Sequence, residues 1–137
     1  ATANAVPGNV ISSPVSCASV LSMLAYGARG ATETALKESL YFSKDDNVQK
    51  KGLKTLNQEL NEPPTYGDFQ GVELRLANKI FLANDINVKP EYQQLAEDVF
   101  KSSIEKVDFS KSEEASKKIN SWCEQQTDSK IKDVVSK

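Results

Sequence analysis

Histidine is absent from this chain of 137 residues, and cysteine, tryptophan and methionine occur only two, one and one times. Without histidine, neither a Ser-His-Asp nor a Cys-His catalytic site can be assembled within the chain. The two cysteines, Cys17 and Cys123, lie far apart in sequence and do not have the spacing of zinc ligands. The residue inventory therefore disfavours an enzyme, and we expect neither a metal site nor a cofactor.

A strong charge of one sign is also absent, because 17 basic and 19 acidic residues leave a formal net charge of −2. This balance argues against a general nucleic-acid binder. No signal peptide is visible at the amino terminus, as a mature or trimmed chain would show. The length and the 39% hydrophobic content suit one soluble globular domain. In such a domain we expect Cys17 and Cys123 to be small buried residues, and a disulfide between them is the alternative.

One long stretch without charge, between Val10 and Ala28, could be mistaken for a membrane span. Its proline, its serines and its length of about five turns instead predict a buried helix of a soluble protein. Ser13 is a suitable N-cap, and Pro14 suits the first helical position. Apolar residues occur all round this helix, which predicts burial on every side. The serines at its start, including Ser13 and Ser16, then need partners in a hydrogen-bond network.

The rest of the chain predicts a single α+β unit without repeats or low-complexity linkers. Ser110 and Glu113 form a plausible capping box, and residues 61–71, which contain prolines and glycines, predict a loop. Hydrophobic periodicity predicts four further helices, over residues 32–41, over 48–60, from Pro90 to Phe100 and after Ser110, and two strands, over residues 72–83 and 104–109.

Two residues in these elements have more than one interpretation. Asn78 interrupts the apolar face of the first predicted strand. It is either a core amide satisfied by neighbouring backbone or a member of the same polar cluster as Ser13 and Ser16. Trp122 lies on the apolar stripe of the last helix, where we interpret it as the anchor of that helix on the sheet; ligand stacking is the alternative.

Three lysines, Lys50, Lys51 and Lys54, cluster on the helix predicted over residues 48–60. The simplest interpretation is a solvated helix face, because nearby acidic residues dilute the positive field. A weak site for a polyanion such as a glycosaminoglycan is the alternative.

Three sequence blocks, in this order, carry a specific resemblance to a known family. They are residues 9–32, the block LANKIFLANDINVKPEYQQLAEDVF at 76–100, and the block VDFSKSEEASKKINSWCEQQTDSKIKDVV at 107–135. Their order and spacing resemble the N-terminal part of the serpin family of serine protease inhibitors, of an arthropod type. The resemblance implies an α+β fold, in which helices pack on strands of a central sheet. It also implies that residues 1–137 are the N-terminal part of a single serpin domain.

The resemblance implies roles for individual residues as well. The shutter, the region where serpins control the opening of their sheet, would contain Asn9, Ser13, Pro14, Ser16 and Asn78. The helix that lies across the sheet would contain Ile119, Asn120, Trp122 and Thr127. Lys50, Lys51 and Lys54 would lie on the helix with which some members bind heparin. Thr32 would begin and cap the helix that follows the shutter.

For function, the resemblance implies irreversible inhibition of serine (or cysteine) proteases. A protease cleaves an exposed reactive loop, and the cleaved loop inserts as a new strand into a metastable central sheet. The target protease is then the expected partner, the expected location is extracellular after secretion, and neither nucleic acid nor a membrane is expected to bind. The alternatives are a non-inhibitory serpin, acting as carrier, storage protein or chaperone, and an interaction domain without inhibitory meaning.

The chain departs from the family pattern at several places. Most of the first long helix of a serpin is missing before Val6, Ser129 stands where many members have glycine, and Cys123 replaces a usual valine. The reactive loop would lie beyond Lys137. We therefore expect these residues to belong to a larger serpin, monomeric at full length, or to associate with the remainder of the serpin.

Overall fold

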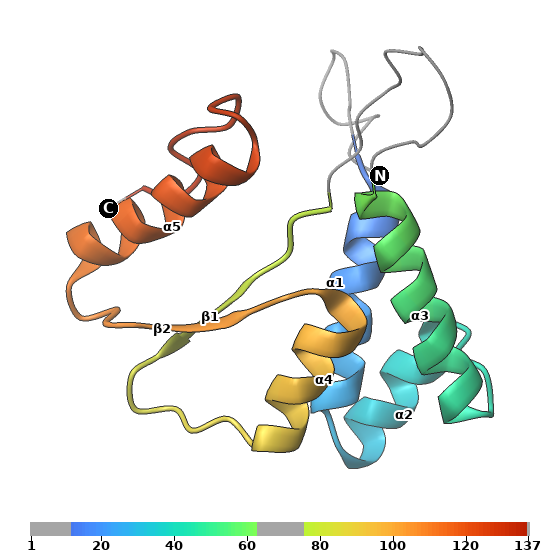
Figure 1. The fold of residues 1–137 in the computed structure, drawn as a ribbon. Helices are drawn as coiled ribbons and strands as arrows, with labels where there is room; N and C mark the ends of the chain where they lie inside the picture. Colours follow the sequence, from blue (N-terminus) through green and yellow to red (C-terminus); the bar gives the residue numbers. More distant parts are fainter. Residues whose placement is uncertain (1–11, 63–75, 137) are drawn as a thin grey trace, which may run out of the picture. The chain divides into compact units, whose positions relative to one another are not determined.

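The computed structural model describes residues 12–62 and 76–136, so Asn9 lies outside the described residues. The chain divides into two compact units, residues 1–40 and residues 41–137. Within the described residues, the first unit contains two helices, and the second contains three helices and two short strands (Figure 1).

The first helix, α1 (Pro14–Gly27), begins as the sequence predicts. The Oγ atom of Ser13 accepts a hydrogen bond from the backbone N–H of Ser16 at 3.3 Å. Pro14 occupies the first turn, where its missing N–H costs no hydrogen bond. The N-cap at Ser13 is thus confirmed. Within the described part of the chain no helix, α1 included, is long and apolar enough to cross a membrane.

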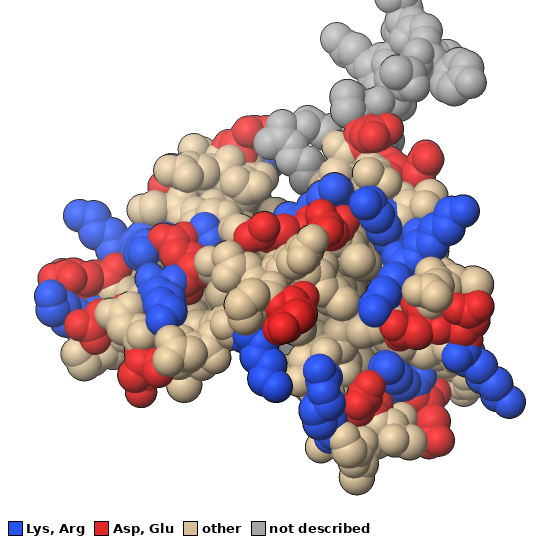
Figure 2. Space-filling model, turned by 60° about the horizontal axis from the view of Figure 1, so that its bottom comes forward, with Lys and Arg blue, Asp and Glu red and all other residues tan. Residues whose placement is uncertain are grey.

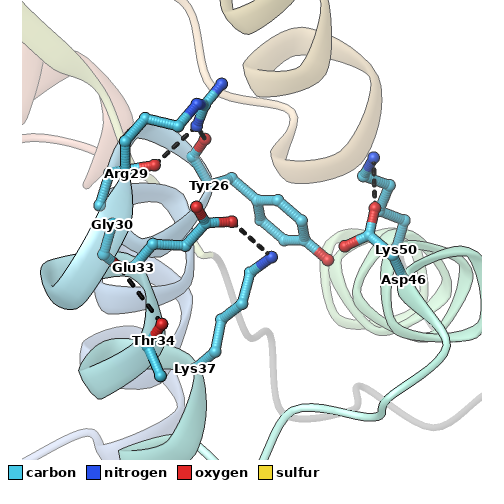
Figure 3. A network of polar contacts seen from close by, with 9 residues as sticks. Tyr26, Arg29, Gly30, Glu33, Thr34, Lys37, Asp46 and Lys50 are labelled. Atoms are coloured by element: carbon cyan, nitrogen blue, oxygen red, sulfur yellow. Dashed lines mark hydrogen bonds and ion pairs between the residues drawn. The ribbon is translucent and has the colours of Figure 1, made fainter.

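The second helix, α2 (Gly30–Ser39), packs against α1 after a tight turn at Arg29. The guanidinium group of Arg29 closes this turn by donating to two backbone carbonyls at 3.1 and 2.6 Å (Figure 3). Gly30 has a φ of +63°, which glycine adopts at little cost, and α2 therefore begins two residues before Thr32. Thr32 lies inside the first turn, so its predicted role as a cap is wrong.

Burial of α1 is one-sided, and the prediction of burial on every side is wrong for the described residues. The buried side carries Ser19, Ser22, Met23, Ala25 and Tyr26. The opposite side leaves three large apolar side chains between 40% and 56% exposed: Val20, Leu21 and Leu24. Cys17, predicted to be buried, is exposed as well, and both cysteines are free thiols. The sequence indicates that this helix is apolar on all sides. It does not indicate whether residues of the same chain pack against every side.

In the second unit, α3 (Asp46–Asn61) and α4 (Pro90–Phe100) lie side by side (Figure 1). The carboxylate of Asp45 accepts hydrogen bonds from the backbone N–H groups of Asn47 (2.9 Å) and Val48 (3.3 Å). This cap starts α3 two residues earlier than predicted. The helix α4 begins at Pro90 as predicted.

The two strands, β1 (Ile80–Ala83) and β2 (Ile104–Val107), pair in parallel, with Ile80 opposite Ile104. The strand predicted over residues 72–83 is wrong at residues 76–79, which are not in a strand; residues 72–75 lie outside the described residues. Among the described residues, β2 has only four residues that can pair with β1. The backbone before Ile80 therefore has no neighbouring strand with which to form hydrogen bonds. Alternation shows which side chains share a face, but a strand also needs a partner for its backbone groups.

The last helix, α5 (Ser112–Gln126), follows β2 after a short turn. The capping box predicted between Ser110 and Glu113 is wrong. One carboxylate oxygen of Asp108 accepts hydrogen bonds from both the backbone N–H (3.1 Å) and the hydroxyl (2.6 Å) of Ser110. The hydroxyl is thereby engaged in a local turn, and α5 begins at Ser112 without a side-chain cap. The same turn ends β2 at Val107, before the predicted position 109.

Candidate functional site

The start of α1, predicted as a buried polar region, is largely open to solvent in the described residues. Ser13 is exposed and Ser16 is half-buried, and their link is the N-cap hydrogen bond. The buried hydroxyl groups of α1 instead belong to Ser19 and Ser22, further along the helix. A shutter role for Asn9, Ser13, Pro14 and Ser16 therefore stays a prediction.

Asn78 lies in the second unit, just before β1, and is half-buried. It lines a cavity of about 300 Å³ together with Trp122 and Lys101. Its amide nitrogen is buried and has no hydrogen-bond partner among the described residues. The interpretation of Asn78 as an amide satisfied by neighbouring backbone is thus wrong for this nitrogen. A polar cluster shared with Ser13 and Ser16 stays a prediction.

Trp122 joins α5 to the sheet. Its ring meets the ring of Phe81 in β1 edge to face, with centroids 5.9 Å apart and an interplanar angle of 78°. This is a favourable geometry for two aromatic rings. This contact supports the interpretation of Trp122 as an anchor of α5 on the sheet, which stays a prediction.

An ion cluster beside Trp122 was not foreseen from the sequence. The carboxylate of Glu105 in β2 binds the ammonium groups of Lys79, just before β1, and of Lys118 on α5, the latter at 2.6 Å. Lys118 also donates to the backbone carbonyl of Lys106 at 3.2 Å. In the alternating pattern of residues 72–83, Lys79 lies on the side opposite the apolar face. Phe81 lies on the same side as Lys79, and this shared side was the signal in the sequence for a contact between them.

Electrostatics in this cluster favour the charged form of Glu105. Hydrogen bonds from Lys118 and Lys79 hold the pKa of Glu105 below its ordinary value. The side chain of Lys79 is only 13% exposed, and its ammonium group lies 5.3 Å from the ring centroid of Phe81 and 5.7 Å from that of Trp122. Lys79 therefore combines an ion pair with two cation–π contacts. We call Lys79, Phe81, Glu105, Lys118 and Trp122 the helix–sheet contact.

The other residues predicted on this helix have different partners. The amide of Asn120 clamps the backbone of Val135, accepting from its N–H and donating to its carbonyl, both at 2.9 Å. The hydroxyl of Thr127 accepts from the N–H of Ile131 at 3.0 Å and donates to the carbonyl of Cys123 at 2.8 Å. Asn120 and Thr127 thus hold the segment after α5 against the helix, while Ile119 is half-buried.

The lysines of α3 lie among acidic groups. Lys50 forms an ion pair with Asp46 at 2.7 Å, one turn earlier on the same helix (Figure 3). Lys51 and Lys54 are exposed. On the face shown in Figure 2, basic and acidic side chains are interspersed. This arrangement is typical of a solvated surface.

Comparisons with known proteins agree along the whole chain. The family model of serpins, serine protease inhibitors, matches residues 1–137. Alaserpin of Manduca sexta is 35% identical over 130 residues, which are 94% of this chain and 31% of alaserpin. The crystal structure of serpin-12 of Manduca sexta has a TM-score of 0.82 and 27% identity, and the match covers 98% of this chain and 36% of that one. Human thyroxine-binding globulin in complex with thyroxine has a TM-score of 0.82 and 26% identity, and the match covers 99% of this chain and 36% of that one.

This chain spans about a third of the length of the relatives that it matches. Its helix-rich architecture with a small sheet is the corresponding part of the serpin fold. The chain belongs to the serpin family.

Proposed function

We propose that this chain is the N-terminal part of a secreted serpin that inhibits serine (or cysteine) proteases irreversibly. A target protease would cleave a reactive loop outside these residues, and the loop would insert as a new strand into the central sheet. The sheet gains main-chain pairing on insertion, and this gain drives distortion of the trapped protease. These residues then supply scaffold and moving parts, and no catalytic group.

One observation carries the proposal: α5 rests on a parallel strand pair through the helix–sheet contact. A helix that covers a sheet must yield when a strand is inserted beneath it. The helix–sheet contact suits this requirement, because it contains ion pairs whose side chains are partly exposed, beside one aromatic pair.

The decisive experiment uses the protein at its natural length. It is incubated with a panel of trypsin-like and chymotrypsin-like proteases and analysed on denaturing gels. We expect an SDS-stable complex with at least one protease, and no complex when the same protease has its catalytic serine blocked. Cleavage without a stable complex across the panel would reject inhibition.

The natural length itself is testable by intact mass spectrometry. We expect a mass well above the 15.0 kDa of these residues, since serpin relatives are about three times longer. A monodisperse 15.0 kDa monomer with a cooperative melting transition would contradict the proposal that these residues are part of a larger serpin.

A non-inhibitory carrier is the second candidate. It is favoured by the similarity to thyroxine-binding globulin, a serpin whose structure contains bound thyroxine. The two candidates differ at the hinge of the reactive loop, where small residues permit insertion and bulky or charged residues prevent it. The sequence of the hinge in the natural-length protein therefore discriminates between them.

For α3 we propose a solvated helix face rather than a polyanion site. Lys50 forms an ion pair with Asp46, so the charge of one of the three predicted lysines is already compensated. Two exposed lysines, Lys51 and Lys54, supply little attraction at physiological salt. Heparin-affinity chromatography tests this: we expect elution at low salt and no change on Lys51→Ala, whereas tight, Lys51-dependent retention would contradict it.

A further inference from the structure

Glu105 forms two ion pairs. One partner lies within the strand pair and the residue that precedes it, and the other lies on α5. Lys79 and Glu105 both belong to the strand pair and the residue that precedes it. Lys118 belongs to α5 and binds the same carboxylate at 2.6 Å and the carbonyl of Lys106 at 3.2 Å. Among these polar contacts, those of Lys118 have to break when α5 leaves the sheet, whereas the pair of Lys79 with Glu105 does not.

Glu105 would remain paired after such a movement. Breaking an ion pair is costly chiefly when the remaining charge is left without compensation in a poorly hydrated place. Here the ammonium group of Lys79 stays with Glu105. The side chain of Lys118 is 45% exposed, so water can hydrate its charge once it is released. The bond between helix and sheet can therefore break while Glu105 stays paired and the released charge of Lys118 is hydrated.

The aromatic part of the contact has the same asymmetry. When Trp122 leaves, Phe81 still has the ammonium group of Lys79 at 5.3 Å from its ring centroid. Lys79 loses only its contact with the indole, which lies at 5.7 Å. Lys79 and Phe81 thus keep their contact with each other when α5 leaves.

We propose that Lys118 is a positioning residue that holds α5 on the sheet, and that Lys79 makes this hold reversible by keeping Glu105 paired when Lys118 is released. The consequence of this proposal for inhibition rests on the proposed function. If the contact of Lys118 is weakened, α5 leaves the sheet more readily and the reactive loop inserts faster.

Hydrogen exchange of the α5 amides in the natural-length protein, without protease, tests the hold directly. Lys118→Ala is compared with Lys117→Ala, a matched control on the same helix, because Lys117 is exposed and forms no ion pair among the described residues. We expect Lys118→Ala to accelerate exchange about two- to fivefold, the range for a partly exposed ion pair, and Lys117→Ala to leave it unchanged. The effect should become smaller near 1 M salt, because screening weakens the attraction between partly exposed charges. Equal exchange in the two variants overturns the proposal.

The role of Lys79 is tested by a double-mutant cycle. In a Lys79→Ala background Glu105 has Lys118 as its remaining partner, so Lys118→Ala should accelerate exchange at least about twofold more than it does in the wild type. An equal or smaller effect overturns the reversible hold. A protease assay with the same variants separates the two proposals: altered exchange without any SDS-stable complex rejects inhibition and leaves the role of Lys118 intact.

Discussion

At the end of α5 the backbone turns through two residues with left-handed φ angles, Asp128 at +47° and Ser129 at +62°. The N–H of Ser129 donates to the carbonyl of Glu124 at 2.8 Å, which closes the helix end in the manner of a Schellman motif. Glycine adopts this conformation more easily than serine, because it has no Cβ atom. The glycine that many serpins have at this position thus has a conformational reason.

Ser129→Gly should therefore stabilise the protein, by about 0.5–1 kcal/mol. The gain is limited because the serine hydroxyl is lost; after the dominant hydrogen bond from Lys132, it makes a smaller contribution to lowering the pKa of Glu124. Urea unfolding measures the change. Ser121→Gly, on the exposed middle of α5, is the control and should cost about 1 kcal/mol. Destabilisation by Ser129→Gly would contradict the assigned backbone conformation.

Ser13 acts on the start of α1 through one hydrogen bond to the N–H of Ser16. Ser13→Ala should lower the free energy of unfolding by about 1 kcal/mol, because an N–H of the first turn loses its partner. Ser12→Ala is the matched control, since Ser12 is exposed and precedes the cap. Chemical denaturation of both variants checks this, and equal stabilities would show that the cap does not contribute.

Glu105 gives the helix–sheet contact a dependence on pH. The ammonium groups of Lys118 and Lys79 lower its pKa from the ordinary value of 4.5. A carboxyl with a lowered pKa in the folded state contributes stability above pH 4.5 and loses it as the pH falls through the folded pKa. Between about pH 5 and pH 2 the wild type should thus lose more stability than Glu105→Gln, by less than about 1 kcal/mol for so exposed a pair. Parallel stability curves would contradict this.

At the scale of elements, Trp122 is the apolar attachment of α5. Trp122→Ala removes its edge-to-face contact with Phe81 and should destabilise the protein by about 2–3 kcal/mol, less than for a fully buried tryptophan. Trp122→Phe keeps an aromatic ring and should cost less than half as much. Thermal unfolding distinguishes the two variants. Equal losses would show that the ring contact does not hold α5.

The elements predicted best from the sequence are those with local causes. Pro90 fixes the start of α4, and Ser13 and Pro14 fix the start of α1, because a cap or a restricted φ acts within one turn. The elements predicted worst depend on distant partners. Residues 76–79 alternate like a strand but have no neighbouring strand among the described residues. The capping box at Ser110 failed because the nearby carboxylate of Asp108 binds that hydroxyl first.

The candidate site divides in the same way. Trp122 was identifiable because a single indole on an apolar helix stripe needs a large apolar partner. The ion cluster could not be identified from the sequence. It consists of Lys79, Glu105 and Lys118 and depends on the parallel register that brings Phe81 opposite Glu105. Register is a property of the pair of strands and cannot be read from either strand alone.

At the scale of the whole molecule, the exposed apolar side of α1 is the main sign that these residues need a larger context. Leu24, at 56% exposed, and its neighbours on that side form a surface that soluble proteins usually cover. We expect Leu24→Ser to increase the solubility of the isolated 137-residue chain and to destabilise the natural-length protein. An unchanged melting temperature of the natural-length variant would show that the surface is not covered at full length. The comparison uses sedimentation for the short chain and thermal unfolding for the long one.

The central claim is that these residues carry part of a metastable sheet that gains a strand when the reactive loop is cleaved. Its most direct test is the melting temperature of the natural-length protein before and after cleavage in that loop. Insertion of a strand that contributes about 5 kcal/mol or more of new pairing should raise the melting temperature of a protein of this length by about 5 °C or more. An unchanged or lower melting temperature after complete cleavage would contradict the claim and leave a non-inhibitory serpin.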